Sequence, residues 1–298
     1  MNTKLKIAGA GVALAGLLAI TGCSSQAEAV KHDNGDEKAM NIAVFNGWDE
    51  GVAASELWKE ILTEKGYDVK LSPADVAPIY QGLSDGDYDV VLDTWLPTTH
   101  KTYMEKNKDK VVDLGAWYDE AKLTLAVNAD APIDSIDELL ANADTFNGKI
   151  IGIEPGAGLT TQVKDNTIPE YKLDEKFTLT TSSTPGMLSE LKTALDKNEN
   201  IVVTLWRPHW AYDAFDIKDL KDPKNTLGVA ESVHSVGTKE FENRFPEAAG
   251  WIKNFTMSSD QLNSLENAMF NSGKIDDYTP VVKKWISENQ DYVDSLTK

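Results

Sequence analysis

Three tryptophans in this chain stand where their side chains could bind a cation. Trp48, Trp95 and Trp206 each follow, within a few residues, the end of a short apolar run. The face of an indole ring attracts positive charge through its quadrupole, by roughly 0.5–1 kcal/mol when exposed and about 2 kcal/mol when desolvated. Three rings around one site therefore favour a cation of spread charge without N–H groups, such as a quaternary ammonium group.

A second set of residues could bind an anion. The glycine-rich turn from Glu154 to Gly158 precedes an expected helix, and a helix start offers free backbone N–H groups and a favourable dipole. His100 could add a ring N–H, although on its own a surface or capping role is the simpler interpretation of this histidine. Together the two sets predict a ligand that carries a positive and a negative end.

Other residues near these positions have simpler interpretations. The remaining tryptophans are core residues where they fall in helical patterns (Trp58, Trp251, Trp285) and are left undecided elsewhere (Trp117, Trp210). Asp49, Glu50 and Asp93 lie near the predicted cage and could favour a cation over a zwitterion. We interpret them as structural residues that hold loops or helix starts.

The elements that must position these residues alternate between strands and helices. Strands are predicted at residues 41–46, 67–71, 88–92, 122–127, 149–153, 177–181 and 201–205, and helices at 54–66, from 135, after 158, at 185–195 and over most of 239–295. Such alternation predicts two α/β units with open, largely parallel sheets covered by helices. Ligands bind beyond the carboxyl ends of strands in such sheets, where the three tryptophans and the glycine-rich turn lie.

The N-terminus has the pattern of a bacterial lipoprotein signal. A basic start precedes an apolar run over residues 7–20, and small residues precede Cys23. We expect residues 1–22 to be removed, Cys23 to carry a lipid, and residues 23–40 to form a flexible tether. The alternative is an ordinary signal peptide with a chance cysteine. The lipid would attach the protein to the outer face of the bacterial cytoplasmic membrane.

Composition and missing motifs exclude several function classes. The 298 residues include 29 basic and 48 acidic ones, a net charge of −19, which disfavours nucleic acid as a partner. Cys23 is the only cysteine, so no internal disulfide forms. The sequence contains no phosphate-loop pattern and no cluster with metal-ligand spacing. We therefore expect no enzyme activity, no cofactor and no metal.

Four sequence blocks resemble those of the glycine betaine-binding proteins of compatible-solute ABC importers. They are Gly47-Trp48-Asp49, Trp95-Leu96-Pro97-Thr98-Thr99-His100, Glu154-Pro155-Gly156-Ala157-Gly158 and Leu205-Trp206-Arg207-Pro208-His209-Trp210. The resemblance extends over nearly the whole chain from Asn41 onward. It implies an extracytoplasmic binding protein that delivers its ligand to the membrane subunits of the importer.

The resemblance also implies a fold and a site. The fold would be the type II periplasmic-binding-protein fold, an α/β fold of two lobes joined by a two-stranded hinge, with the ligand in the cleft. Lobe one would comprise residues 41–124 and 236–298, and lobe two residues 125–235. By matching motifs, the trimethylammonium group would lie in a prism of three tryptophans, and the carboxylate would meet His100 and two backbone amides. These residues are Trp48, Trp95, Trp206, His100, Gly158 and Leu159.

Alternatives remain at the level of the ligand and of the class. Carnitine, proline betaine, choline or a sulfonium analogue would suit the same cage, because the length between the two charges depends on the width of the cleft. From other classes, an enzyme on the same scaffold or a surface adhesin that stacks tryptophans on sugars is conceivable. Fold alone does not decide between these functions.

Overall fold

The computed structural model describes residues 37–271 and 275–298. The predicted signal segment 1–22, the predicted lipidation site Cys23 and most of the predicted tether lie outside the described residues. Within the described part, no helix is both long and apolar enough to cross a membrane.

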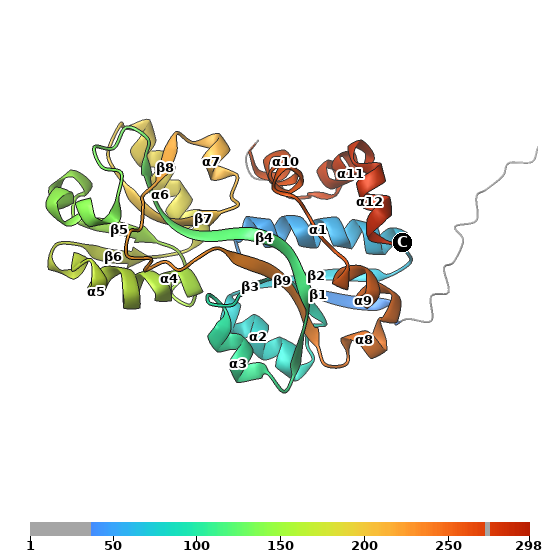
Figure 1. The fold of residues 1–298 in the computed structure, drawn as a ribbon. Helices are drawn as coiled ribbons and strands as arrows, with labels where there is room; N and C mark the ends of the chain where they lie inside the picture. The colour runs from blue at the N-terminus through green and yellow to red at the C-terminus, as the bar shows by residue number, and fades with distance from the viewer. Residues whose placement is uncertain (1–36, 272–274) are drawn as a thin grey trace, which may run out of the picture. The chain divides into compact units, whose positions relative to one another are not determined.

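Among the described residues, eight strands form one continuous hydrogen-bonded path in the order β2-β1-β3-β9-β4-β7-β5-β6 (Figure 1). A ninth strand, β8, lies off this path and pairs with β4. The strands are β1 (Ala39–Phe45), β2 (Asp68–Ala74), β3 (Val90–Leu96), β4 (Val111–Asn128), β5 (Lys149–Gly152), β6 (Thr178–Thr181), β7 (Val202–Arg207), β8 (Ile217–Asp219) and β9 (Glu231–Thr238). The α/β class predicted from the sequence is confirmed.

Strand β4 takes part in two sheets. Its first part pairs with β9 as far as Ala121, and its second part pairs with β7 from Lys122 onward. We call the sheet from β2 to the first part of β4, with its covering helices, lobe one. The sheet from the second part of β4 to β6, with its helices, is lobe two. Figure 1 shows β4 running from one lobe into the other.

Parallel pairing is confined to the outer strands of each lobe. β1 pairs in parallel with β2 and β3, and β5 pairs in parallel with β6 and β7. The strands at the junction, β4 and β9, pair antiparallel with each other and with β7 and β3. The sheets are thus mixed rather than largely parallel, because the chain passes between the lobes along β4 and returns along β9.

Helices cover both lobes. In lobe one they are α1 (Asp49–Glu64), α2 (Val76–Asp85), α3 (Lys101–Asn107), α8 (Phe241–Arg244), α9 (Pro246–Lys253), α10 (Ser259–Phe270), α11 (Thr279–Glu288) and α12 (Gln290–Leu296). In lobe two they are α4 (Gly158–Gln162), α5 (Ile168–Glu170), α6 (Thr184–Asp196) and α7 (Ala211–Ala214). Short 3₁₀ and π turns complete lobe two: η1 (Ile136–Glu138), η2 (Leu140–Phe146), η3 (Val163–Thr167) and η4 (Leu173–Glu175).

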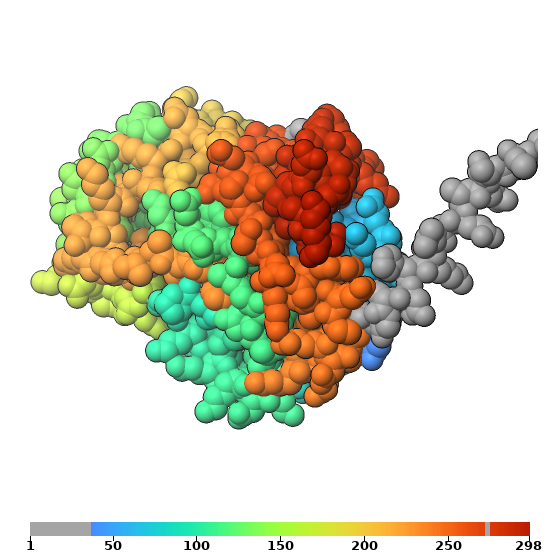
Figure 2. Space-filling model, turned by 45° about the vertical axis from the view of Figure 1, so that its right-hand side comes forward, coloured from blue at the N-terminus to red at the C-terminus, as the bar shows by residue number. Residues whose placement is uncertain are grey.

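Helix α1 is amphipathic and central to lobe one. Ala54, Leu57, Trp58 and Ile61 recur at helical spacing and are all buried. Helices α10 and α11 pack against α1, and Figure 2 shows the red C-terminal helices at the surface over light-blue residues from the early part of the chain. The mostly helical C-terminal run expected from the sequence is therefore present.

Several boundaries differ from the sequence prediction. β1 begins at Ala39, within the range predicted as tether, because Ala39 and Met40 pair with β2. β3 and β7 extend beyond their predicted ends and include Trp95 and Trp206, since these residues pair with β9 and β4. Both tryptophans thus lie in the last residues of strands and not in the following turns.

Candidate ligand-binding site

All six residues that the sequence predicted to bind a ligand line one cavity. The space between its walls, including the part open to solvent, is about 280 Å³. Its walls are Trp48, Glu50, Trp95, Thr99, His100, Leu123, Ile153, Ala157, Gly158, Leu159 and Trp206. The structure therefore brings together the six predicted residues from four separate chain segments, at the junction of the two lobes.

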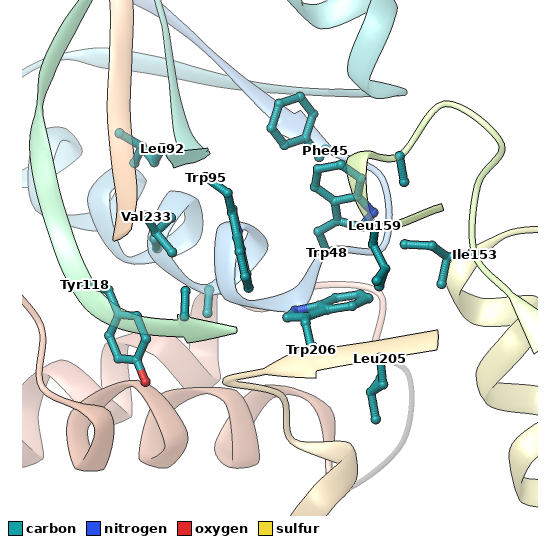
Figure 3. Packing of buried hydrophobic residues seen from close by; sticks show 14 of the residues in the cluster. Phe45, Trp48, Leu92, Trp95, Tyr118, Ile153, Leu159, Leu205, Trp206 and Val233 are labelled. Carbon is teal, nitrogen blue, oxygen red and sulfur yellow. The ribbon is translucent and has the colours of Figure 1, made fainter. Parts of the chain in front are cut away.

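The three tryptophans lie on three sides of this space (Figure 3). Trp95 lies at the end of β3 and Trp206 at the end of β7, while Trp48 is the residue before α1. Their exposed fractions are 7% for Trp48 and 3% for each of the others, so the rings are almost entirely removed from bulk water. A cation between them would be desolvated, the condition under which attraction to ring faces is strongest.

Each indole N–H donates to a carboxylate. The donor–acceptor distances are 3.3 Å from Trp48 Nε1 to Glu154 Oε2, 2.9 Å from Trp95 Nε1 to Asp93 Oδ1, and 2.9 Å from Trp206 Nε1 to Glu50 Oε2. These bonds fix the orientation of each ring and occupy its only polar atom.

His100 is held as a neutral ring with a free donor. Its Nδ1 accepts the backbone N–H of Trp95 at 2.9 Å, and its own backbone N–H donates to the Trp95 carbonyl at 3.0 Å. The imidazole stacks on Trp48 with ring centroids 5.4 Å apart and an interplanar angle of 4°. Burial lowers the pKa of His100 to about 3. The proton therefore lies on Nε2, which is buried at the cavity without a partner among the described residues.

The glycine-rich turn leads into α4 at the opposite wall. The first N–H groups of a helix have no intrahelical acceptor, and no side chain caps this helix. Gly158 and Leu159 are its first two residues, so their amides are available to a ligand. A Cβ on Gly158 would lie 2.4 Å from the Thr99 carbonyl oxygen, which means that only glycine permits this approach between the lobes.

The loop that carries His100 is anchored by the hinge. Glu231, 4% exposed at the start of β9, accepts the backbone N–H groups of Thr98 and Thr99, and also the Thr99 hydroxyl. These bonds join the His100 loop to the strand that returns from lobe two. The position of His100 thus depends on both the loop and the hinge.

Further contacts join the two lobes around the cavity. The indole N–H groups of Trp48 and Trp206 cross from one lobe to a carboxylate of the other. Trp210, undecided from the sequence, donates its N–H to Asp49 across the same junction. Trp117 instead is a core residue, 2% exposed, whose N–H donates to the Leu92 carbonyl. The lobes therefore stand closed on each other.

Three carboxyl groups near the cage, those of Glu50, Asp93 and Glu266, are buried, and that of Asp49 beside them is partly exposed. Burial raises the pKa of Asp49 to about 7 and that of Glu50 to about 8. Burial also raises the pKa values of Asp93 and Glu266 far above the usual range, with Glu50 adding further repulsion to both. In the described part of the chain, none of the four forms an ion pair with lysine or arginine.

The sequence did not identify Glu50 and Glu154 as site residues. Glu50 lines the cavity, although its place in the first turn of α1 suggested only a role at the helix start. Glu154 accepts the Trp48 N–H as well as the Thr184 backbone N–H at 2.7 Å and hydroxyl at 3.0 Å. The available signal for Glu154 was its position as the acidic residue that begins the glycine-rich turn. Its partners could not be predicted locally, because Trp48 and Thr184 lie 106 and 30 residues away in the sequence.

Comparisons with known proteins agree on one family. A family described as the substrate binding domain of ABC-type glycine betaine transport systems matches residues 38–288. The glycine betaine/carnitine transport binding protein GbuC of Listeria monocytogenes is 36% identical over 168 residues, which are 56% of this chain and 54% of that protein. The matched stretch thus spans about half the length of this relative.

Two solved structures resemble the chain over most of its length. One is the glycine betaine/L-proline-binding protein ProX from Borrelia burgdorferi, 32% identical, with a TM-score of 0.81 and coverage of 88% of this chain and 97% of that one. The other is lactococcal OpuAC in its closed conformation with glycine betaine, 30% identical, with a TM-score of 0.80 and coverage of 88% and 100%.

Proposed function

Because the chain belongs to the family of substrate-binding domains of ABC-type glycine betaine transport systems, we propose that it captures glycine betaine for an ABC importer. The family consists of binding proteins, so an enzyme activity is not part of the proposal. In this function the protein binds its ligand outside the cytoplasm and presents it to the membrane subunits of the importer.

The observation that carries the proposal is the composition of the cavity walls. Three nearly buried indoles surround a space that also receives the unpartnered Nε2 of His100. A quaternary ammonium group has no N–H to donate, so ring faces are the suitable surface for it. Trp48, Trp95 and Trp206 would hold the trimethylammonium group.

The other end of the cavity offers hydrogen-bond donors to a carboxylate. His100 Nε2–H and the amides of Gly158 and Leu159 would bind the two oxygens. Bonds from such donors to a charged acceptor are stronger than neutral ones, with a net worth of about 1.5–3 kcal/mol. The donors belong to both lobes, so the ligand would stabilise the closed arrangement over an open one.

The lipid anchor is a separate proposal that rests on the sequence. Small residues before Cys23 and an apolar run over residues 7–20 are the pattern that lipoprotein signal peptidases cleave in bacteria. A lipid on Cys23 would keep the binding protein close to its importer at the outer face of the cytoplasmic membrane.

Choline is the second ligand that a particular observation favours. Glu50 lines the cavity and could provide a negative counter-charge for a ligand without a carboxylate. Carnitine and proline betaine also carry both charges, and GbuC of Listeria monocytogenes is a glycine betaine/carnitine transport binding protein. Sugars would require polar side chains around the rings, whereas the cavity walls are mostly apolar.

The test is a calorimetric titration of ligand-free mature protein with glycine betaine, carnitine, choline and glycine. Saturable binding of glycine betaine with no binding of glycine is expected, because glycine lacks the methylated cation. Trp95→Ala should weaken glycine betaine binding by at least tenfold, since a desolvated ring contributes about 2 kcal/mol. Trp251→Ala, at a half-buried tryptophan of α9 outside the cavity, is the matched control. Absence of heat with every methylated ammonium compound would refute the proposal.

A further inference from the structure

Glu50 is an acidic residue in the wall of the cavity, beside the three tryptophans of the proposed cage. Its side chain lines the same space as the three tryptophans, is 1% exposed, and accepts the Trp206 N–H at 2.9 Å. No lysine or arginine among the described residues forms an ion pair with it. An ionised carboxylate in this position would be one of the strongest charges near a bound ligand.

The groups around Glu50 oppose its ionisation. Asp49 precedes it on α1, Asp93 approaches it from β3, and Glu266 approaches from α10. Glu50 and Asp93 repel each other electrostatically, and two neighbouring buried carboxyl groups cannot both ionise readily. Among the described residues, Tyr118 on β4 also interacts with Glu50, His209 lies 3.8 Å from Asp49, and the buried His100 is neutral.

The repulsion among these buried carboxyl groups implies that the group retains at least one proton at neutral pH. Asp93 Oδ2 and both Glu266 carboxyl oxygens are buried and have no hydrogen-bond partner among the described residues. Burial raises the pKa of Glu50 to about 8, so its proton is retained at neutral pH and lost in mildly alkaline solution. The charge of the cavity wall thus differs between these two conditions.

We propose that Glu50 is a specificity-determining residue, whose protonated carboxyl keeps the cage neutral and favours a zwitterion, and whose ionised form shifts the preference toward a cation. The inference rests on the proposed function, because it concerns how the same cavity chooses among quaternary ammonium ligands.

The physical reason is the position of the second ligand charge. An ionised Glu50 attracts the trimethylammonium group of glycine betaine and of choline alike. It also repels the carboxylate of glycine betaine, a few ångströms farther away at the His100 end, and choline has no such group. Coulomb energies in a protein of intermediate dielectric make this difference worth about tenfold in relative affinity.

The experiment measures the ratio of choline to glycine betaine affinity by calorimetry at pH 6 and pH 9. In the wild type we expect the ratio to rise about tenfold with pH. Glu50→Gln imitates the protonated acid, because its amide can accept the Trp206 N–H and donate to Asp93. For Glu50→Gln, the ratio of choline to glycine betaine affinity is expected to equal the wild-type value at pH 6, both at pH 6 and at pH 9. Glu105→Gln removes an exposed charge on α3 and should behave like the wild type.

A second measurement uses the wild type alone and does not depend on the folding of a variant. Titrations at pH 8 in buffers of different ionisation enthalpy count the protons exchanged on binding. Choline should take up fewer protons, or release more, than glycine betaine, because the uncompensated cation favours ionised Glu50. Equal proton counts, or the same pH dependence in Glu50→Gln as in the wild type, would overturn the inference. If neither ligand bound the wild type, the proposed function itself would fail.

Discussion

At the scale of single residues, the cavity combines fixed rings with one free donor. Every cage indole donates its N–H to a carboxyl group: the Trp95–Asp93 bond lies within lobe one and fixes that ring before the lobes close, whereas the bonds of Trp48 and Trp206 fix their rings in the closed arrangement. His100 is fixed in the same way through two reciprocal bonds to the backbone of Trp95. Such preorganisation lowers the conformational entropy lost on binding.

A substitution of His100 tests its donor role. His100→Phe keeps an aromatic ring against Trp48 but removes the Nε2–H donor, and it also removes the Nδ1 acceptor of the Trp95 N–H, a loss that affects both ligands alike. We expect glycine betaine affinity to fall by about ten- to a hundredfold, the worth of a hydrogen bond to a charged group, and choline affinity to fall much less. Titration calorimetry with both ligands measures this. His234→Phe on β9, where the native ring pairs with Asp113 outside the cavity, is the control.

An equal loss for both ligands would contradict a donor role and indicate a purely structural one. Because the pKa of His100 lies near 3, its ring stays neutral between pH 6 and pH 8. His100 itself should therefore introduce no pH dependence of glycine betaine binding in that range.

The types of the site residues could be predicted from the sequence, but their contacts could not. Tryptophans near strand ends predicted a cage, whereas His100 was assigned as a donor through the resemblance to glycine betaine-binding proteins. The acceptor of the Trp206 N–H is Glu50, 156 residues earlier, and the acceptor of the Trp210 N–H is Asp49, 161 residues earlier. Such pairs arise only when the two lobes meet, so no local pattern reveals them.

At the scale of elements, the sequence did not predict the first part of β4 or helix α2, and each omission has a physical reason. The first part of β4 contains register shifts and Gly115 at φ 122°, so its alternation of apolar and polar residues is broken. Helix α2 contains Pro78 and Gly82, which weaken a helical pattern. A Cβ at Gly82 would lie 2.4 Å from the Tyr88 ring, so packing rather than helix propensity selects this glycine.

The effect of replacing a glycine by alanine should depend on where the glycine lies, and Gly158 at the start of α4 is a sensitive position. Gly158→Ala would place its Cβ 2.4 Å from the Thr99 carbonyl oxygen of the other lobe. We expect about tenfold weaker ligand binding, because the backbone must shift where the two lobes meet and a misplaced amide loses part of its bond to the ligand. Isothermal titration of Gly158→Ala and of a control variant, Gly250→Ala, against glycine betaine measures the change.

Gly250→Ala is the matched substitution in α9, where a Cβ would meet nothing within 4 Å. It should leave ligand affinity unchanged and raise the free energy of unfolding by about 0.5–1 kcal/mol, since alanine is the better helix former. If Gly158→Ala bound the ligand as tightly as Gly250→Ala, close contact between Gly158 and Thr99 would not be needed for binding.

At the scale of the whole molecule, closure depends on contacts outside the cavity as well as on the ligand. Tyr103 of lobe one donates its hydroxyl to the Gly156 carbonyl of lobe two at 3.0 Å. Asn267 of α10 donates to Asp213 of α7 at 2.6 Å. These bonds exist only when the lobes are closed, so each should bias the open–closed equilibrium without contacting the ligand.

Tyr103→Phe tests this view of closure, because it removes one bond between the lobes and retains the ring that stacks on Tyr80. We expect the ligand to dissociate about three- to tenfold faster, the worth of one hydrogen bond, with little change in the association rate. Stopped-flow tryptophan fluorescence measures both rates. Tyr292→Phe removes an equivalent bond to the Thr256 carbonyl within lobe one and should leave both rates unchanged. Equal rates in the two variants would show that closure does not use the Tyr103 contact.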